Sequence, residues 1–267
     1  MDAVRDNLFG ECIAEFIGTF VFLFCGMGCV AALKLAGASF GQWEISIVWG
    51  MAVAMGVYLT AGVSGAHLNP SVTIALAFFG SFPKRKIIPF IAAQMAATFC
   101  AAALVYLLYQ NLFDIALAEA GTDAAKRLGL AGIFCTFPNA NITLAQAVLT
   151  EFTITAILMA LIMALTDDGN GVPRGPLAPL LIGVLVALLG ATFGPLTGFA
   201  MNAARDFGPR LFAYFAGWGT DVMTGYPLNS SLSVPYFLVP LIVPIFGACL
   251  GAFAYDKLIE PYLLHKK

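Results

Sequence analysis

The feature that most limits the possible folds is a series of six apolar stretches, each near the length needed to cross a lipid bilayer. A membrane-spanning helix takes roughly 20 mostly apolar residues. With 60% hydrophobic and 10% charged residues, against about 25% charged in ordinary soluble domains, the chain is predicted to be an all-α membrane protein with six transmembrane helices. The predicted spans are residues 9–33, 43–61, 87–109, 144–166, 177–193 and 234–255.

The distribution of Lys and Arg predicts the orientation of these spans. One side of a six-span chain carries Arg5, Lys84, Arg85, Lys86, Arg174, Lys257, Lys266 and Lys267, and the other carries Lys34, Lys126, Arg127 and Arg210. Because cytoplasmic loops hold an excess of positive charge, both termini are expected in the cytoplasm. The short tails favour a bacterial plasma (inner) membrane, and the net charge of −2 argues against a nucleic-acid partner.

A short polar motif occurs twice inside this apolar chain. Residues 64–71 read Ser-Gly-Ala-His-Leu-Asn-Pro-Ser, and residues 197–204 read Thr-Gly-Phe-Ala-Met-Asn-Ala-Ala. Three spans per half is an odd number, so the second copy enters the membrane from the opposite side and the halves are inverted repeats. We therefore expect one channel domain over residues 1–267, with halves at approximately 1–110 and 144–267 joined by a loop at 110–143.

Each copy of the motif precedes an apolar segment, 70–79 or 203–215, that is too short to cross the membrane and is predicted to be a re-entrant half-helix. Irregular backbone at membrane depth is tolerated where it lines an aqueous cavity, so the two motifs predict a pore. Asn69 and Asn202 are expected to cap the half-helices and to offer amide donors at the pore centre. The positive ends of both helix dipoles would oppose cations there. The residues expected to offer pore-lining carbonyls are Gly65, Ala66, His67, Leu68, Phe199, Ala200 and Met201.

These motifs make the chain resemble the aquaporin superfamily, the major intrinsic proteins, in its glycerol-facilitator branch. The resemblance covers the whole chain and is most specific at residues 64–70, 169–176, 198–202 and 205–209. It implies a passive channel for glycerol and other small uncharged polyols, with some water, that excludes ions and protons. It also implies a homotetramer in the lipid bilayer, without cofactor, metal or catalytic residues.

The resemblance further implies a selectivity filter formed by Trp49, Gly190, Phe199 and Arg205. Water-selective members typically carry a His at the position of Gly190, where this chain leaves room. Trp49 and Phe199 would face the carbon backbone of a polyol, while Arg205 donates hydrogen bonds to its hydroxyls and repels cations. Asp206 is also typical of the glycerol branch.

Glu15 and Glu151 lie inside predicted spans, where an ionisable side chain is by default a candidate functional group. The resemblance implies that both carboxylates brace the re-entrant loops by accepting backbone N–H bonds. An alternative is a proton relay, which would make the chain an ion-coupled carrier, and a second alternative is a water-selective channel. An enzyme is disfavoured because the apolar region has no nucleophile and base pair or metal-ligand set.

The two motifs depart from the family pattern, which is Asn-Pro-Ala in most members. Ser71 replaces the first Ala, and Ala203 replaces the second Pro. The serine is expected to be a mild change. Since the two prolines usually pack against each other, Ala203 is expected to leave the pore centre slightly looser, with Asn202 still capping its helix.

Overall fold

The computed structural model describes residues 7–170 and 175–263, and its regular elements in these ranges are all helices. Six of them are long and apolar enough to span a membrane, which confirms the predicted fold class. They are α1 (Leu8–Leu35), α2 (Gln42–Ser64), α4 (Ile87–Leu108), α7 (Leu144–Thr166), α8 (Ala178–Thr197) and α11 (Leu238–Leu258). The predicted charges at positions 5, 174, 266 and 267 lie outside the described residues.

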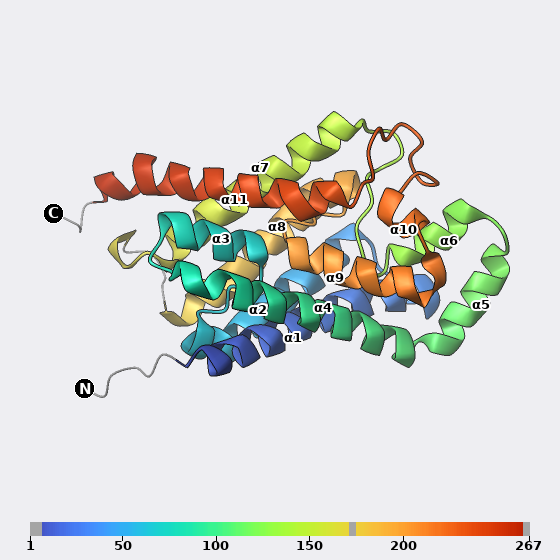
Figure 1. Ribbon diagram of the computed structural model, residues 1–267, viewed down its shortest axis with the longest axis horizontal. Coiled ribbons are helices and arrows are strands. Elements are labelled where there is room, and N and C mark those ends of the chain that lie inside the picture. Colours follow the sequence, from blue (N-terminus) through green and yellow to red (C-terminus); the bar gives the residue numbers. More distant parts are fainter. Residues whose placement is uncertain (1–6, 171–174, 264–267) are drawn as a thin grey trace.

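The long helices run lengthwise through the molecule, and α1 begins at the same end at which α11 ends (Figure 1). Helix α1 packs against both α2 and α4, helix α7 packs against both α8 and α11, and α2 packs on α8 between the halves. That last contact depends on two glycines. A Cβ on Gly183 would lie 2.5 Å from the carbonyl oxygen of Gly50, so the two backbones approach as closely as small residues permit.

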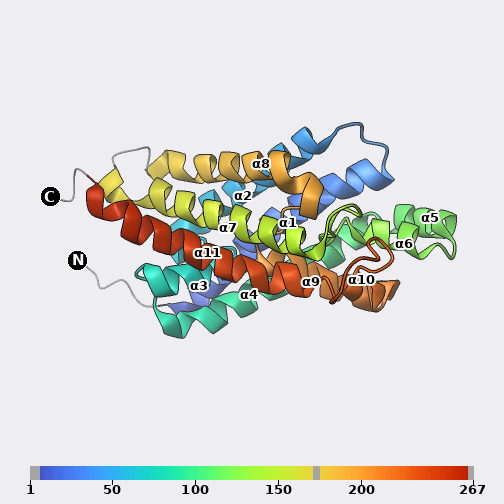
Figure 2. The same ribbon diagram turned by 90° about the horizontal axis from the view of Figure 1, so that it is seen from above.

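Both predicted half-helices are present, as α3 (Pro70–Phe79) and α9 (Ala203–Ala213). Two perpendicular views place α3 toward the end where α1 begins and α9 toward the end that carries α5 (Gln110–Ala120) and α6 (Ala124–Ala131) (Figures 1 and 2). The half-helices therefore enter the bundle from opposite ends, as inverted repeats require. The second is shorter than the predicted 203–215 because the backbone widens into a π-helical turn over Tyr214–Trp218.

Most helix ends lie within three residues of the predicted spans, and the larger differences are at α8, at α11 and in the connection 110–143. Helix α8 continues four residues beyond 193 and includes Pro195, because a proline near a helix end removes only one hydrogen bond. Helix α11 begins at Leu238 rather than at 234. The connection 110–143 contains two short helices that the sequence analysis did not anticipate, α5 (Gln110–Ala120) and α6 (Ala124–Ala131).

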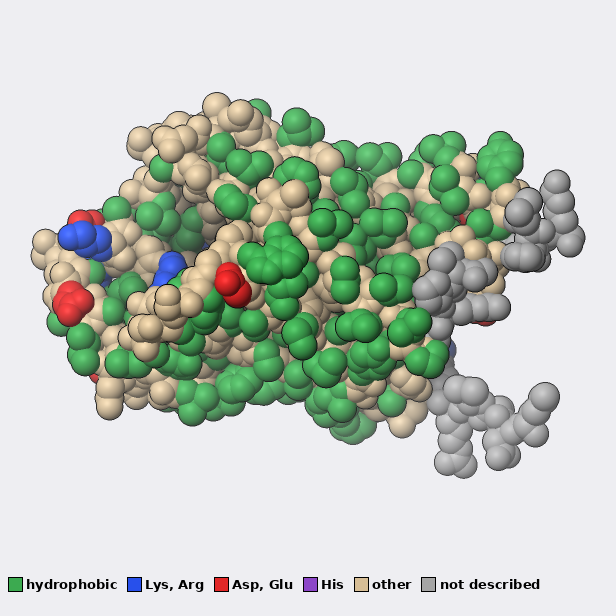
Figure 3. Space-filling view, turned by 180° about the vertical axis from the view of Figure 1, so that it is seen from behind, with side chains coloured by type: hydrophobic (Ala, Val, Ile, Leu, Met, Phe, Trp, Pro, Cys, Tyr) green, Lys and Arg blue, Asp and Glu red, His purple; other side chains and the backbone are tan. Residues whose placement is uncertain are grey.

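Apolar side chains cover much of the lateral surface of the molecule (Figure 3). Large exposed examples are Ile88 on α4, Leu149 on α7 and Phe246 on α11, each more than half exposed. Most of the charged side chains visible in Figure 3 lie toward the end that carries α5 and α6. A soluble protein rarely exposes apolar patches this extensive, so the lateral surface is suited to contact with lipid.

Candidate functional site

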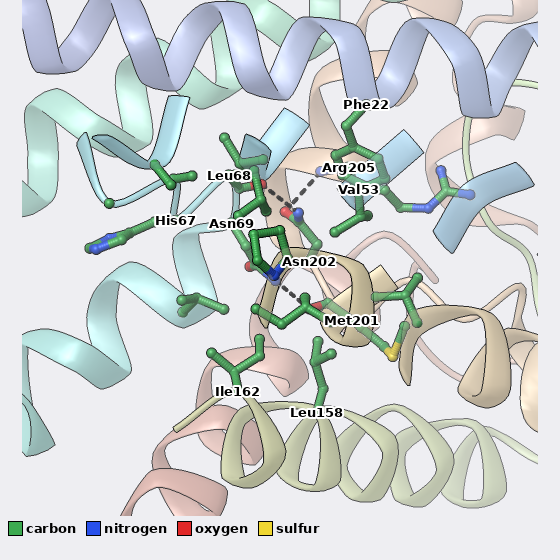
Figure 4. A pocket seen from close by; sticks show the side chains of 18 of the residues that line it. Phe22, Val53, His67, Leu68, Asn69, Leu158, Ile162, Met201, Asn202 and Arg205 are labelled. Atoms are coloured by element: carbon green, nitrogen blue, oxygen red, sulfur yellow. Dashed lines mark hydrogen bonds between the residues drawn. The ribbon is translucent and has the colours of Figure 1, made fainter. Parts of the chain in front are cut away.

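A cavity of about 420 Å³ lies where the loops preceding α3 and α9 meet (Figure 4). Its polar lining consists of Asn69, Thr166, Asn202, Arg205 and all seven residues predicted to offer carbonyls. The remaining lining is almost entirely apolar, and Leu158 and Ile162 project into the cavity from α7 (Figure 4). The apolar lining residues are Phe22, Trp49, Val53, Val57, Ala61, Val72, Leu76, Ala178, Pro179, Ile182 and Val186, besides those two.

The two loops that line the cavity share an unusual backbone conformation. Ala66 and Leu68 have φ angles of 49° and 51°, and Phe199 and Met201 have φ angles of 42° and 52°. These are the third and first residues before each capping Asn, so the conformation repeats position for position. A left-handed conformation costs a residue with a side chain roughly 1–2 kcal/mol. Both loops therefore need external interactions to hold them.

The Glu15 carboxylate holds the first loop. Its Oε1 accepts hydrogen bonds from Ser64 Oγ at 2.6 Å and from the backbone N–H of His67 at 2.8 Å. Its Oε2 accepts from the backbone N–H of Leu68 at 2.8 Å. The side chain is fully buried and is not part of the cavity lining.

The Glu151 carboxylate holds the second loop in the same way. Its Oε1 accepts from Thr197 Oγ1 at 2.6 Å and from the N–H of Ala200 at 3.0 Å, and its Oε2 accepts from the N–H of Met201 at 2.9 Å. The hydroxyl residue five positions before each Asn, visible in the sequence repeat, thus has a structural role that the sequence did not disclose. The donors and their order match those around Glu15.

These bonds decide where the loop carbonyls point. In a planar trans peptide the N–H of one residue points opposite to the C=O of the residue before it. Because the N–H groups bonded to the glutamates face away from the cavity, the carbonyls of Ala66 and His67, and those of Phe199 and Ala200, face the opposite way. Together they provide a row of acceptors along the polar lining.

The two capping asparagines also join the halves to each other. Asn69 Oδ1 accepts from the N–H of Ser71 at 2.8 Å, and Asn202 caps α9 in the same way, which confirms both predicted caps. Asn69 Nδ2 donates to the carbonyl of Met201 at 2.9 Å, and Asn202 Nδ2 donates to the carbonyl of Leu68 at 2.8 Å (Figure 4). Each amide thus retains one further N–H, while these two carbonyls are already engaged.

The structure brings the four predicted filter residues together. The guanidinium carbon of Arg205 lies 4.0 Å from the centroid of the Trp49 ring, and the Trp49 and Phe199 centroids lie 6.2 Å apart at 79°. Arg205 Nη1 donates to the carbonyl of Phe134 at 3.2 Å. Gly190 is not among the cavity-lining residues and lies behind the Phe199 ring.

A buried ion pair beside the filter was missed by the sequence analysis. Asp206 Oδ1 accepts from Arg210 Nε at 2.7 Å, and Asp206 Oδ2 accepts from the N–H of Thr136 at 2.7 Å. Both ionic side chains are buried. Their spacing of four residues on one helix is the signal that could have identified the pair. Because Asp206 pairs with Arg210, the charge of Arg205 is left to act on the cavity.

A second missed group lies beside the first loop. Gln94 Nε2, from α4, donates to Glu15 Oε2 at 2.8 Å and to Thr73 Oγ1 at 3.1 Å. Thr73 Oγ1 also lies 3.1 Å from His67 Nδ1, and the His67 ring packs against Phe82. The His67 ring thus contacts its own half of the protein. Nothing in the spacing of Gln94 relative to the motif indicated this contact.

Comparison with known proteins gives consistent matches. The sequence profile of the family described as Major intrinsic protein matches residues 3–255. A glycerol uptake facilitator protein of Shigella flexneri is 63% identical over 259 residues, which cover 96% of this chain and 90% of that protein. A propanediol uptake facilitator of Citrobacter freundii is 57% identical over 258 residues, which cover 96% of this chain and 94% of that protein.

Among solved structures, the aquaglyceroporin from Plasmodium falciparum superposes with a TM-score of 0.82 at 32% sequence identity. The match covers 96% of this chain and 98% of that one, so no large part of either fold is unaccounted for. Six apolar spans, two half-helices that meet at capping asparagines, and a family match across most of the sequence lead to one conclusion. This chain is a multi-pass membrane protein and belongs to the major intrinsic protein family.

Proposed function

We propose that the chain is a passive channel for glycerol and other small uncharged polyols, with some water. The observation that carries the proposal is the uneven lining of the cavity. Carbonyl acceptors, the donors of Asn69, Asn202 and Arg205, and the hydroxyl of Thr166 form its polar part, and apolar side chains form the rest. A polyol in an extended conformation likewise has hydroxyls and carbon-bound hydrogens on different edges, so it can hydrogen-bond on one side and contact apolar groups on the other.

The filter supports polyols over water alone. Trp49 and Phe199 present an apolar corner next to the Arg205 guanidinium, which suits the carbon chain of a polyol whose hydroxyls accept from the arginine. The glycine at position 190 adds no side chain to this corner. The names of the relatives, glycerol and propanediol uptake facilitators, support the same class of solute.

The exclusion of ions and protons has a physical basis in the same groups. The N-terminal ends of α3 and α9 both face the cavity centre, and each carries the positive end of a helix dipole. The cationic side chain of Arg205 lines the cavity beside them. A cation or hydronium ion would lose its hydration shell in an environment whose positive potential repels it, whereas that potential does not oppose the entry of a neutral polyol.

The positions of the two buried glutamates favour passive transport over ion-coupled transport. Neither side chain lines the cavity, and both accept several hydrogen bonds from the loops they hold. A proton relay would need exchange between these carboxylates and the solute path. We assign them a bracing role, and the chain performs no chemistry on the solute.

We further propose the assembly and orientation that the sequence analysis indicated. The protein would form a homotetramer with one pore in each subunit, in the plasma (inner) membrane, with both termini in the cytoplasm. Each pore would lie within the single domain 1–267, between halves at approximately 1–110 and 144–267. Reaction of single cysteines placed in the end loops with an impermeant reagent would test the orientation.

Stopped-flow light scattering on proteoliposomes tests the function. Vesicles are first shrunk with an impermeant osmolyte to measure water flow and then mixed with glycerol to measure re-swelling, for the parent protein and for Gly190→His. We expect fast glycerol re-swelling in the parent, and a fall to the level of protein-free vesicles with retained water flow in the variant. Water flow without glycerol flow in the parent would indicate a water channel. The absence of both flows would favour a coupled carrier.

A further inference from the structure

The Phe199 ring lies across two glycines on α8, although the sequence analysis identified only one. A Cβ on Gly190 would lie 2.8 Å from Phe199 Cε2, at one edge of the ring. A Cβ on Gly194 would lie 2.8 Å from Phe199 Cδ1 and 3.2 Å from Cε1, at the other edge. The two glycines are one helical turn apart, so together they form a flat surface of bare backbone beneath the ring.

We propose that Gly194 determines the width of the selectivity filter jointly with Gly190, by allowing the Phe199 ring to lie flat on α8. This inference rests on the proposed function, because it identifies a further residue that sets which polyols pass. Gly194 is buried and does not line the cavity, so its effect on the solute is transmitted through Phe199.

A methyl group at position 194 would move the ring toward the cavity. Ordinary carbon–carbon contacts lie at about 3.5–4.0 Å, so a 2.8 Å contact requires a shift of about 1 Å. Retreat of α8 would open its close packing on α2, because Gly183 lies on the same face of α8 about three turns before Gly194, and a Cβ there would lie 2.5 Å from the carbonyl oxygen of Gly50. Since Phe199 lines the cavity and packs edge-on against Trp49, a ring displaced from α8 moves toward the solute path.

A second contact fixes the same part of α8. Gln42, at the start of α2, donates from Nε2 to the carbonyl of Gly190 at 2.9 Å, and it crosses directly over Gly194 to do so. A Cβ at position 194 would overlap this amide. The bare backbone at Gly194 therefore admits two groups at once, the Phe199 ring and the Gln42 side chain, and Gln42 keeps the Gly190 surface in place.

The test is Gly194→Ala, measured with water and with polyols of three, four and five carbons in the proteoliposome assay. We expect glycerol permeability to fall about tenfold, because the displaced ring narrows the filter, and the four- and five-carbon polyols to lose entry altogether. Water permeability should stay within about twofold, because a narrowed apolar corner excludes the widest solutes first. Gly62→Ala is the matched control, since a Cβ there would meet no atom within 4 Å.

The double variant Gly194→Ala/Phe199→Leu distinguishes a clash with the Phe199 ring from a general disturbance of the packing of α8. A smaller side chain at 199 removes the overlap, so we expect glycerol permeability to return to that of Phe199→Leu alone. A matching variant, Gly194→Ala/Gln42→Ala, removes only the overlap with the amide and should remain impaired. Rescue by Gln42→Ala but not by Phe199→Leu would overturn the proposal.

The remaining outcomes also decide the question. If the parent carries no glycerol, the proposed function fails whatever Gly194→Ala does. If the parent carries glycerol and a folded Gly194→Ala transports all the polyols equally well, the inference alone fails. If Gly194→Ala is not recovered as a folded protein, recovery of the double variant with Phe199→Leu supports the contact, and equal instability of that double variant overturns it.

Discussion

The two re-entrant loops have the same backbone and the same glutamate brace, yet different groups surround them. Around the first loop, neutral side chains supply the additional contacts, Gln94 from α4 and Thr73 from α3. Beside the second, a buried ion pair between Asp206 and Arg210 holds α9 to the connection before α7 through Thr136. The two loops therefore have the same backbone conformation, but the side chains that surround them differ.

This difference separates two requirements of a pore. Both loops must present carbonyls to the cavity, and that need is met twice by the same left-handed residues and the same carboxylate. Discrimination between solutes needs a charge and an aromatic corner only once along the path. The cation that faces the cavity, Arg205, lies on α9, where the adjacent ion pair neutralises Asp206 and leaves the arginine charge available.

The largest expected effect comes from breaking the ion pair. Asp206→Asn leaves the fully buried Arg210 without its counter-ion, and removing one partner of a buried pair costs about 3–5 kcal/mol. Thermal unfolding in detergent, followed by tryptophan fluorescence, measures the loss. The matched change beside the first loop, Thr73→Val, removes neutral hydrogen bonds and should cost only about 1 kcal/mol. Equal losses in the two variants would show that the two surroundings do not differ in energy.

A smaller effect is expected from the glutamate braces, and it should differ between the halves. A Gln at either position turns one acceptor oxygen into a donor that faces backbone N–H groups, at a cost of about 1–3 kcal/mol. Beside Glu15, the Oε1 of Gln94 is a buried acceptor without a partner, so a flip of that amide can receive the new donor. Glu151→Gln should therefore lower the unfolding temperature more than Glu15→Gln. The reverse order would exclude this compensation by Gln94.

The smallest expected effect concerns the reactivity of Cys135. This residue lies in the connection before α7, which the ion pair between Asp206 and Arg210 holds. Burial raises the pKa of its thiol to about 12, so at pH 7 almost none is the reactive thiolate. In a variant that keeps only this cysteine, a water-soluble maleimide should not label it. Adding Asp206→Asn should expose the thiol and permit labelling. Labelling of the parent at an equal rate would mean that the ion pair does not hold the connection closed.

Much of the fold could be predicted because it depends on local composition. The apolar stretches gave all six spans, and the boundaries of 144–166 and 70–79 agree with Leu144–Thr166 and Pro70–Phe79. The end of α8 and the start of α11 were missed because an apolar stretch need not coincide with a helix. The two helices inside 110–143 were missed because their sequence is neither uniformly apolar nor long.

The pore residues were predictable to a lesser degree. The repeated motif located Asn69, Asn202 and the loop residues, and the family resemblance located Trp49, Phe199 and Arg205, all of which line the cavity. The contact of Asn69 with the carbonyl of Met201 joins residues 132 positions apart. The roles of Gln94, Thr136 and Gly194 likewise depend on partners that lie far away in the chain.

The sequence by itself determined that this protein crosses a membrane six times, that its halves are inverted copies, and that a capped half-helix follows each motif. Those properties follow from the length of the apolar stretches, the odd number of spans in each half and the capping preference of Asn. Each of these can be read from a continuous stretch of the sequence. Only the tertiary structure decided which carbonyls face the cavity, which charge remains unpaired there, and how closely Phe199 approaches α8. Those properties arise where separate helices pack together, and a difference of about 1 Å between packed side chains changes what can pass.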